Sequence, residues 1–475
     1  MAKTFIKNVG ITGFSSLCAQ GLTLLLFFIA VRFLGPGDIG LFAIISVIVA
    51  YANLLGEFGG SAYIVHSKKL DSSIIDAVFT LNLLIAITLT VIFYLLASFF
   101  YEFFDLTQLF PIQLASMTIF FYSLGSVFKG VLQRELLFKK LSLAELFSSI
   151  ISFLFSIFLL FFEYGVIALV SFPLVKGAIE LLINLYFTNR KYSLSFDFKI
   201  WKKIYDFSIY LLINNTINQA SRSADQLIIA RQFGDVMLGF YSVAYKIMLF
   251  PVHRFVGIVS KVAFPTLASQ RDDYSRLGSN YTRMVVVAAL SATTLVSLIW
   301  FNTDVFVRTL LGEGWIDVVP LLNILVPVAI MQSVMSTVGS LFLITGKTKY
   351  GLKLQIISTT VTIISFIIGS NWGVIGICWA YLISNLLLFI PLYNASISII
   401  NLKLSEILGK LMIHVIYGIL IGFFSVSIVG IFNFPPLIEL VISFTAAIVV
   451  LVYYVDYGFL KTRLIERNLT KSKTT

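Results

Sequence analysis

Long runs of apolar residues constrain the fold of this sequence more than any other feature. A helix needs roughly 20 such residues to cross a bilayer, and about fourteen runs of that length can be placed. The expected spans are residues 11–31, 38–56, 77–101, 110–130, 144–162, 163–187, 204–230, 237–262, 282–302, 318–344, 351–370, 373–396, 409–431 and 436–456. Hydrophobic residues make up 59% of the 475 residues, and the short connections leave no room for a soluble domain. The sequence therefore predicts an all-α polytopic membrane protein.

The basic residues predict how the chain is oriented in the membrane. With the amino terminus placed in the cytoplasm, 27 of the 34 Lys and Arg lie at the cytoplasmic ends of the expected spans. Such an asymmetry in short loops sets membrane orientation, so both termini are expected inside, in a cell inner (plasma) membrane. The net charge of +11 then belongs to a cytoplasmic rim that meets anionic headgroups and does not indicate nucleic-acid binding. The basic tail, residues 461–475, is interpreted as a membrane-side anchor or a disordered end, with docking of a partner as the alternative.

Two pairs of similar short segments, here called echoes, predict that a six-helix unit occurs twice. Residues 32–40 (RFLGPGDIG) and 231–239 (RQFGDVMLG) share one Arg and two Gly at a constant offset, and residues 164–167 (YGVI) resemble 372–375 (WGVI). We expect an amino-terminal lobe over residues 1–195, a carboxy-terminal lobe over 196–400, and two further helices with the basic tail over 401–475. Both units begin on the same side, so they are parallel repeats, which can enclose a cavity that opens to one side at a time.

Polar residues within the expected spans indicate where such a cavity lies. A charge at the bilayer centre costs roughly 2.5 kcal/mol or more, so such groups usually face water or a partner. The seventh span carries four polar residues at the spacing of one helical face, with Gln219 beside them: Asn215, Asn218, Arg222 and Asp225. Gln20 lies on the corresponding polar face of the first span. These side chains are the candidate lining of the cavity.

Four basic residues fall inside the expected spans: Lys176, Arg222, Lys246 and Arg254. Arg222 and Lys246 are expected at similar depth, since a helix rises 1.5 Å per residue, and Arg254 follows one to two turns later. Cations in a cavity select an anionic group such as phosphate. Alternatively, Arg222 pairs with Asp225 along one helix and Lys246 reaches toward the interface. Lys176 could also reach backbone carbonyls that a nearby proline frees.

Motifs for catalysis are absent from the sequence. It contains neither the GxxxxGK[ST] loop that cradles phosphates nor the HExxH pattern that binds zinc. Cys18 and Cys378 both lie in apolar runs, which gives neither a disulfide framework nor a metal-ligand spacing. We therefore expect a transporter rather than an enzyme, without a metal site.

Several motifs along the chain carry a resemblance to a known family. They are residues 34–42 (LGPGDIGLF), 133–142 (QRELLFKKLS), 224–230 (ADQLIIA), 239–246 (GFYSVAYK), 250–254 (FPVHR), 263–267 (AFPTL) and 310–315 (LLGEGW). On these residues the chain resembles the polysaccharide transporter branch of the multidrug/oligosaccharidyl-lipid/polysaccharide exporter superfamily, the Wzx-type O-antigen and exopolysaccharide flippases.

This resemblance implies two lobes of six helices plus two helices, and a flippase that moves undecaprenyl-diphosphate-linked oligosaccharide repeat units to the outer leaflet by alternating access. It implies coupling to H⁺ or Na⁺, for which Asp225 is the candidate, with the lipid bilayer, a polysaccharide polymerase and chain-length proteins as partners. On this hypothesis the diphosphate is held by Arg222, Lys246 and Arg254, and the sugars by Asn215, Asn218, Gln219 and Gln20.

Two other functions stay open at this point. A cation-coupled multidrug exporter of the same superfamily is expected to carry acidic residues, rather than Arg and Lys, in the middle of the membrane. A membrane polysaccharide polymerase or ligase needs large outer loops for substrate and acid–base groups. The longest outer loop expected here, residues 302–317, is too short to favour one.

Overall fold

The structure is a computed structural model, and it describes residues 2–67, 71–252, 256–432, 434–451 and 453. Arg254 and the basic tail lie outside these residues. Helices and short 3₁₀ turns make up the regular structure of the described part, in which no strand occurs. The predicted all-α class is therefore confirmed. The chain divides into two compact units, Met1–Ser242 and Val243–Thr475, whereas the three predicted domain ranges stay a prediction.

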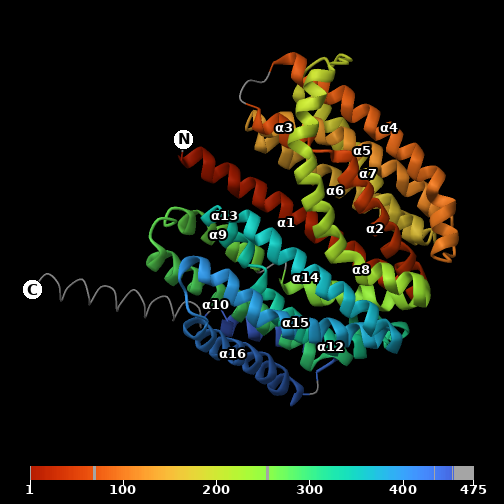
Figure 1. The fold of residues 1–475 in the computed structure, drawn as a ribbon. Helices are drawn as coiled ribbons and strands as arrows, with labels where there is room; N and C mark the ends of the chain where they lie inside the picture. The colour runs from red at the N-terminus through yellow and green to blue at the C-terminus, as the bar shows by residue number, and fades with distance from the viewer. Residues whose placement is uncertain (1, 68–70, 253–255, 433, 452, 454–475) are drawn as a thin grey trace, which may run out of the picture. The chain divides into compact units, whose positions relative to one another are not determined.

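The first unit is a bundle of helices joined mostly by short connections (Figure 1). Within it, α5 packs against both α4 and α7, and α6 packs against both α7 and α1. The boundary between the units falls inside α8. The helices are α1 (Ala2–Phe33), α2 (Pro36–Glu57), α3 (Gly60–His66), α4 (Ser72–Phe103), α5 (Phe110–Arg134), α6 (Phe138–Phe161), α7 (Val166–Thr188) and α8 (Phe198–Pro251).

Glycine breaks helix α8 into two segments. The helix is 54 residues long, and at 1.5 Å per residue a straight helix of that length would reach about 80 Å, far more than a bilayer core. Gly234 has φ 79° and ψ −178°, a backbone conformation that L side chains avoid and glycine adopts readily. The chain turns there, as expected from the two predicted spans at 204–230 and 237–262.

The turns that carry the first sequence echo lie against each other inside the first unit. A Cβ atom added to Gly40 would overlap the backbone carbonyl of Asp235, and one added to Gly239 would overlap the carbonyl of Pro36. Each glycine therefore lets the other turn approach backbone to backbone. The contact is reciprocal, because the last glycine of each echo packs against a backbone carbonyl of the other echo.

The second unit continues with α9 (Gly257–Ala268), α10 (Tyr274–Phe301), α11 (Thr303–Leu310), η2 (Glu313–Trp315), α12 (Val318–Met335), α13 (Val338–Thr345), α14 (Thr348–Gly369), η3 (Ser370–Trp372), α15 (Gly373–Ile397), η4 (Ser398–Ile400) and α16 (Leu404–Gly430). A shorter apolar helix, Pro436–Leu451, follows. Gly373, in the second echo, has φ 76°, and its counterpart Gly165 has φ 59°. Both members of that echo thus begin a helix from the same unusual backbone region.

Helix α16 packs on α10 through small residues. A Cβ atom at Gly422 would lie 2.6 Å from Ser297 Cβ, and one at Gly418 would lie 3.0 Å from Thr293 Cβ. Two glycines four residues apart let membrane helices approach closely. This contact holds the predicted thirteenth helix against α10 within the second unit.

Among the described residues, eleven helices are long and apolar enough to cross a membrane. Two of these runs, Phe198–Pro251 and Thr348–Ile400, exceed 50 residues and turn at Gly234 and Gly373. The last expected span, 436–456, is described only as far as the 16-residue helix that ends at Leu451. The multi-pass character is confirmed, while the number of fourteen crossings stays a prediction.

Candidate functional site

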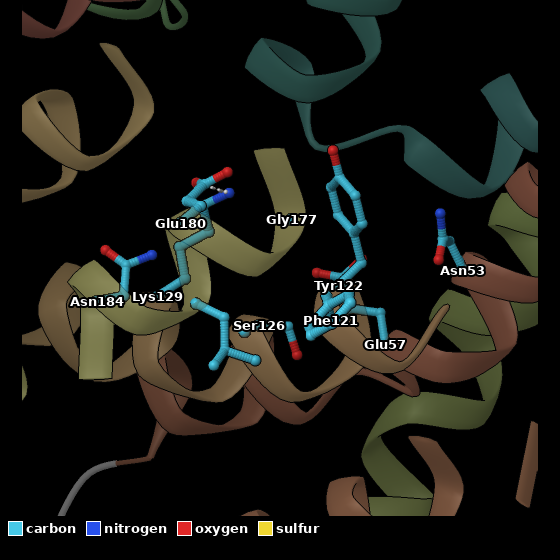
Figure 2. A pocket seen from close by; sticks show the side chains of 11 residues that line it. Asn53, Glu57, Phe121, Tyr122, Ser126, Lys129, Gly177, Glu180 and Asn184 are labelled. Carbon is cyan, nitrogen blue, oxygen red and sulfur yellow. Dashed lines mark ion pairs between the residues drawn. The ribbon is translucent and has the colours of Figure 1, made fainter. Parts of the chain in front are cut away.

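A polar pocket lies within the first unit among α2, α5 and α7 (Figure 2). Its volume is about 190 Å³. The side chains that line it combine amides, carboxylates, one ammonium group and aromatic rings. They include Asn53 and Glu57 from α2, Phe121, Tyr122, Ser126 and Lys129 from α5, and Glu180 and Asn184 from α7.

An ion pair joins two sides of this pocket. Lys129 Nζ lies 2.7 Å from Glu180 Oε1, and their side chains are 42% and 8% exposed, as the dashed line in Figure 2 marks. Burial of a lone carboxylate would be costly, and a partner at this distance offsets that cost. The exposed ammonium group leaves part of the pair accessible from the pocket.

Two amide oxygens of the pocket have no hydrogen-bond partner. They belong to Asn53 and Asn184, and Asn184 is 1% exposed. A buried polar atom without a partner costs about 1–3 kcal/mol, so buried polar groups are nearly always paired in folded proteins. The pocket therefore offers hydrogen-bonding capacity that the protein itself does not use.

Glycine makes room for the aromatic wall of the pocket. A Cβ atom at Gly177 would lie 3.0 Å from Tyr122 Cε2 and 3.2 Å from Phe121 Cβ. Any larger residue at this position of α7 would push into α5. The close approach of the two helices thus sets the position of the Tyr122 ring.

Charged residues extend from the pocket toward α6. Ser16 of α1 donates a hydrogen bond to Glu145 Oε2 at 2.9 Å, and the half-buried Lys176 lies within electrostatic range of Glu145 and Glu180. The predicted intramembrane cation Lys176 therefore has acidic neighbours. Contact of Lys176 with backbone carbonyls, which the sequence left open, stays a prediction.

The predicted face of the seventh span lies on the first segment of α8. Asn215 and Arg222 are exposed, and Asn218 and Gln219 are half-buried. Gln20, on α1, is exposed. These side chains are thus accessible or partly so, as a substrate-contacting face requires, but their contact with sugars stays a prediction.

Asp225 is buried and has its own hydrogen-bond donors. It is 2% exposed, and its carboxylate accepts a hydrogen bond from the Tyr241 hydroxyl at 2.6 Å and another from the backbone N–H of Gln226 at 2.8 Å. The turn at Gly234 brings Tyr241 back to this position. The structure describes Arg222 and Asp225 in full and records no ion pair between them.

The predicted cationic set falls in different parts of the chain. Arg222 belongs to the first unit and Lys246, which is exposed, to the second. Arg254 lies outside the described residues. A phosphate site formed by these three residues therefore stays a prediction.

None of the residues that line the pocket was predicted from the sequence as a site residue, and Lys129, Glu180 and Asn184 are its most informative members. Lys129 lies one residue before the end of an expected span, where it was counted with the cytoplasmic rim. Glu180 falls inside the expected span 163–187, where an acidic side chain needs a partner as a basic one does. A search for opposite charges on neighbouring spans would have found the pair. Among the described residues, no group of three or more His, Cys, Asp or Glu side chains is placed to hold a metal ion.

Comparison with known proteins gives consistent matches. A family model described as "Polysaccharide biosynthesis protein" matches residues 29–320. An "Uncharacterized membrane protein in cps region" of Klebsiella pneumoniae is 26% identical over 429 residues, which cover 88% of this chain and 86% of that protein. "Lipopolysaccharide biosynthesis protein WzxC" of Escherichia coli (strain K12) is 25% identical over 369 residues, or 76% of this chain and 75% of that one. The resemblance predicted from the motifs is confirmed.

Solved structures share the fold. The structure titled "Lipid II flippase MurJ, inward closed conformation" superimposes with a TM-score of 0.72 and 15% sequence identity, over 94% of this chain and 99% of that chain. At such low identity the similarity concerns the fold. It confirms that the chain shares the helical fold of that structure.

Proposed function

The chain belongs to the polysaccharide biosynthesis protein family, and on that premise we propose that it is a flippase for polyprenyl-diphosphate-linked oligosaccharide repeat units. The observation that carries this proposal is the family match over residues 29–320. The part of the chain that the structure describes also holds eleven helices long and apolar enough to cross a membrane. A relative named for lipopolysaccharide biosynthesis covers three quarters of the chain. This supports a substrate that is later built into a surface polysaccharide such as O-antigen, exopolysaccharide or capsule.

Translocation would proceed by alternating access. A large polar head group cannot cross the hydrocarbon core unaided, because every unsatisfied polar group there costs several kcal/mol. In alternating access, the two repeated halves of a transporter rock and open a substrate site to one side of the membrane at a time. The polyprenyl chain would stay in lipid throughout, so only the head group needs a polar path.

The residues proposed to act in this cycle divide by charge. Asp225, buried beside Tyr241, is the proposed site of H⁺ or Na⁺ coupling. The diphosphate would be held by Arg222, Lys246 and Arg254, because guanidinium and ammonium groups bind phosphate oxygens strongly. The sugars would contact the polar face formed by Asn215, Asn218, Gln219 and Gln20.

We place the protein in the inner (plasma) membrane with both termini in the cytoplasm, on the basis of its basic residues. The repeat units released outside would pass to a polysaccharide polymerase and to chain-length proteins, which are the proposed partners. The chain itself would form no covalent bond.

The function is tested by the leaflet in which lipid-linked repeat units reside. We would label cells with and without the gene using membrane-impermeant periodate and identify the oxidised repeat units by mass spectrometry. If the protein is the flippase, its loss leaves repeat units shielded in the inner leaflet, and the wild-type gene restores their labelling.

Two results would contradict the proposal in different ways. Repeat units that reach the outer leaflet without the gene but stay unpolymerised would indicate a polymerase or ligase. Repeat units with unchanged labelling and polymerisation would indicate an exporter of some other compound.

A further inference from the structure

We propose that the pocket among α2, α5 and α7 binds one sugar ring of the lipid-linked oligosaccharide. The inference rests on the proposed flippase function and adds to it a sugar subsite on the first unit, apart from the polar face of α8. Neither the family match nor the names of the relatives assign this pocket a role. Four features of the pocket support the inference: its size, its free amides, its ion pair and its aromatic wall.

The size of the pocket suits a single ring. A water needs about 10–15 Å³ of such volume, so the 190 Å³ of the pocket has room for on the order of a dozen waters. A single pyranose ring with its hydroxyl groups is smaller than that space. The pocket therefore admits at least one sugar residue of the repeat unit.

The free amides match the chemistry of sugar hydroxyls. Asn184 is buried and its amide oxygen has no partner. Asn53, on the other side of the pocket, is half-buried, and its amide oxygen also has no partner. A hydroxyl group can donate to such an oxygen and accept from an amide N–H at the same time. A bound sugar would therefore satisfy groups that the empty protein leaves unpaired.

The ion pair argues for a neutral ligand. Glu180 already holds Lys129 at 2.7 Å, so a metal cation entering the pocket would meet an ammonium group. A phosphate would meet the carboxylates of Glu180 and Glu57, both of which line the pocket. A sugar hydroxyl can accept a hydrogen bond from the ammonium group and donate one to the carboxylate without disturbing either charge.

The aromatic wall completes the site. Phe121 and Tyr122 line the pocket together, and Figure 2 shows the Tyr122 ring rising from α5 beside it. The C–H face of a pyranose is apolar and packs against an aromatic ring. Small-molecule sites commonly combine such rings with a few well-placed polar groups.

The test measures binding by the full chain in lipid nanodiscs, using native mass spectrometry and two probes. The first is the lipid-linked repeat unit extracted from the producing strain, and the second is undecaprenyl diphosphate without sugar. We expect the wild-type protein to bind the first probe about tenfold more tightly than the second. Asn184→Leu, which keeps the side-chain volume and removes the amide, should abolish this difference and leave binding of the bare carrier unchanged.

Two further variants guard against a purely structural effect. The double variant Lys129→Met with Glu180→Met removes both charges and preserves packing, and it should also lower affinity for the sugar-bearing probe alone. Ser171→Ala is the matched control, because Ser171 is a buried polar residue of the same helix that bonds to Ser156 outside the pocket. We expect its affinity for both probes to equal that of the wild type.

The possible outcomes separate this inference from the proposed function. If the wild type prefers the sugar-bearing probe and both pocket variants retain that preference, the sugar subsite is wrong while the flippase stands. Equal wild-type affinity for the two probes would also overturn the subsite. If the wild type binds neither probe, the subsite is wrong, and if deletion of the gene also leaves the periodate labelling of repeat units unchanged, the proposed function fails as well.

Discussion

At the scale of single residues, the most specific feature is the buried carboxylate of Asp225. Its two oxygens accept hydrogen bonds from the Tyr241 hydroxyl and from a backbone N–H. Asp225→Asn keeps a hydrogen-bond acceptor for Tyr241 and removes the charge that an ion gradient can act on. We expect the variant to be produced at the normal level, but its transport should no longer respond to external pH or sodium. Leaflet labelling at two pH values, with and without sodium, measures this response.

Tyr241→Phe separates structure from coupling at this carboxylate. It removes the hydroxyl donor and leaves the charge, so the free energy of unfolding should fall by about 1.5–3 kcal/mol, the usual value of a hydrogen bond to a charged group. The response to pH and sodium should persist. If transport in cells that carry Asp225→Asn still responds to pH and sodium as in the wild type, Asp225 has no role in coupling.

The sequence predicted part of this residue-scale arrangement. Helical spacing correctly singled out Asp225 as a polar residue in an apolar span, because the period of a helix is local information. Its partner Tyr241 lies 16 residues further on and reaches it only because the chain turns at Gly234. Spacing alone also grouped Arg222 with Asp225, although one is exposed and the other buried, since a shared face does not fix which side chains a neighbouring helix covers.

At the scale of elements, the reciprocal glycine contact sets how closely the two echo turns approach. Gly40→Ala would place a methyl group on the backbone carbonyl of Asp235, and a backbone atom cannot rotate away as a side chain can. Overpacking of this kind costs typically about 1–3 kcal/mol. We therefore expect a lower thermal unfolding temperature for the detergent-purified variant, together with reduced surface polysaccharide.

Gly37→Ala is the matched control for this substitution. It lies on the same helix, but its added Cβ would be 3.5 Å from Val236 Cγ2, an ordinary van der Waals distance, and alanine is the better helix former. Its unfolding temperature should equal or exceed that of the wild type. Equal stability of the two alanine variants would show that the turns do not pack as described.

The elements themselves were largely predictable, and the contacts between them were not. The apolar runs predicted most helices because length and hydropathy are properties of a contiguous segment. The echo at residues 32–40 and 231–239 was visible as a pattern, yet the pattern did not predict that its two copies touch. No helix contact was predicted from the glycines at positions 418 and 422, although their spacing is typical of close helix pairs.

At the scale of the whole molecule, the fold class and family followed from the sequence because both rest on features spread along the chain. Apolar runs recur from end to end, and the family motifs lie between residues 34 and 315. The pocket of the first unit could not be found in the same way. It needs side chains from α2, α5 and α7, and only the folded bundle brings these three helices together.

The orientation of the whole chain provides the last prediction. Basic loops stay in the cytoplasm, so the loop that contains Lys191 should lie inside, and the turn around Gly314 should lie outside. Both positions are exposed. In a parent with Cys18→Ala and Cys378→Ala, a single Gly314→Cys should react with an impermeant maleimide while the inner membrane is intact. A single Lys191→Cys should react only after permeabilisation. The reverse pattern would show that the chain is inserted in the opposite orientation, with the loop that contains Lys191 outside the cell membrane.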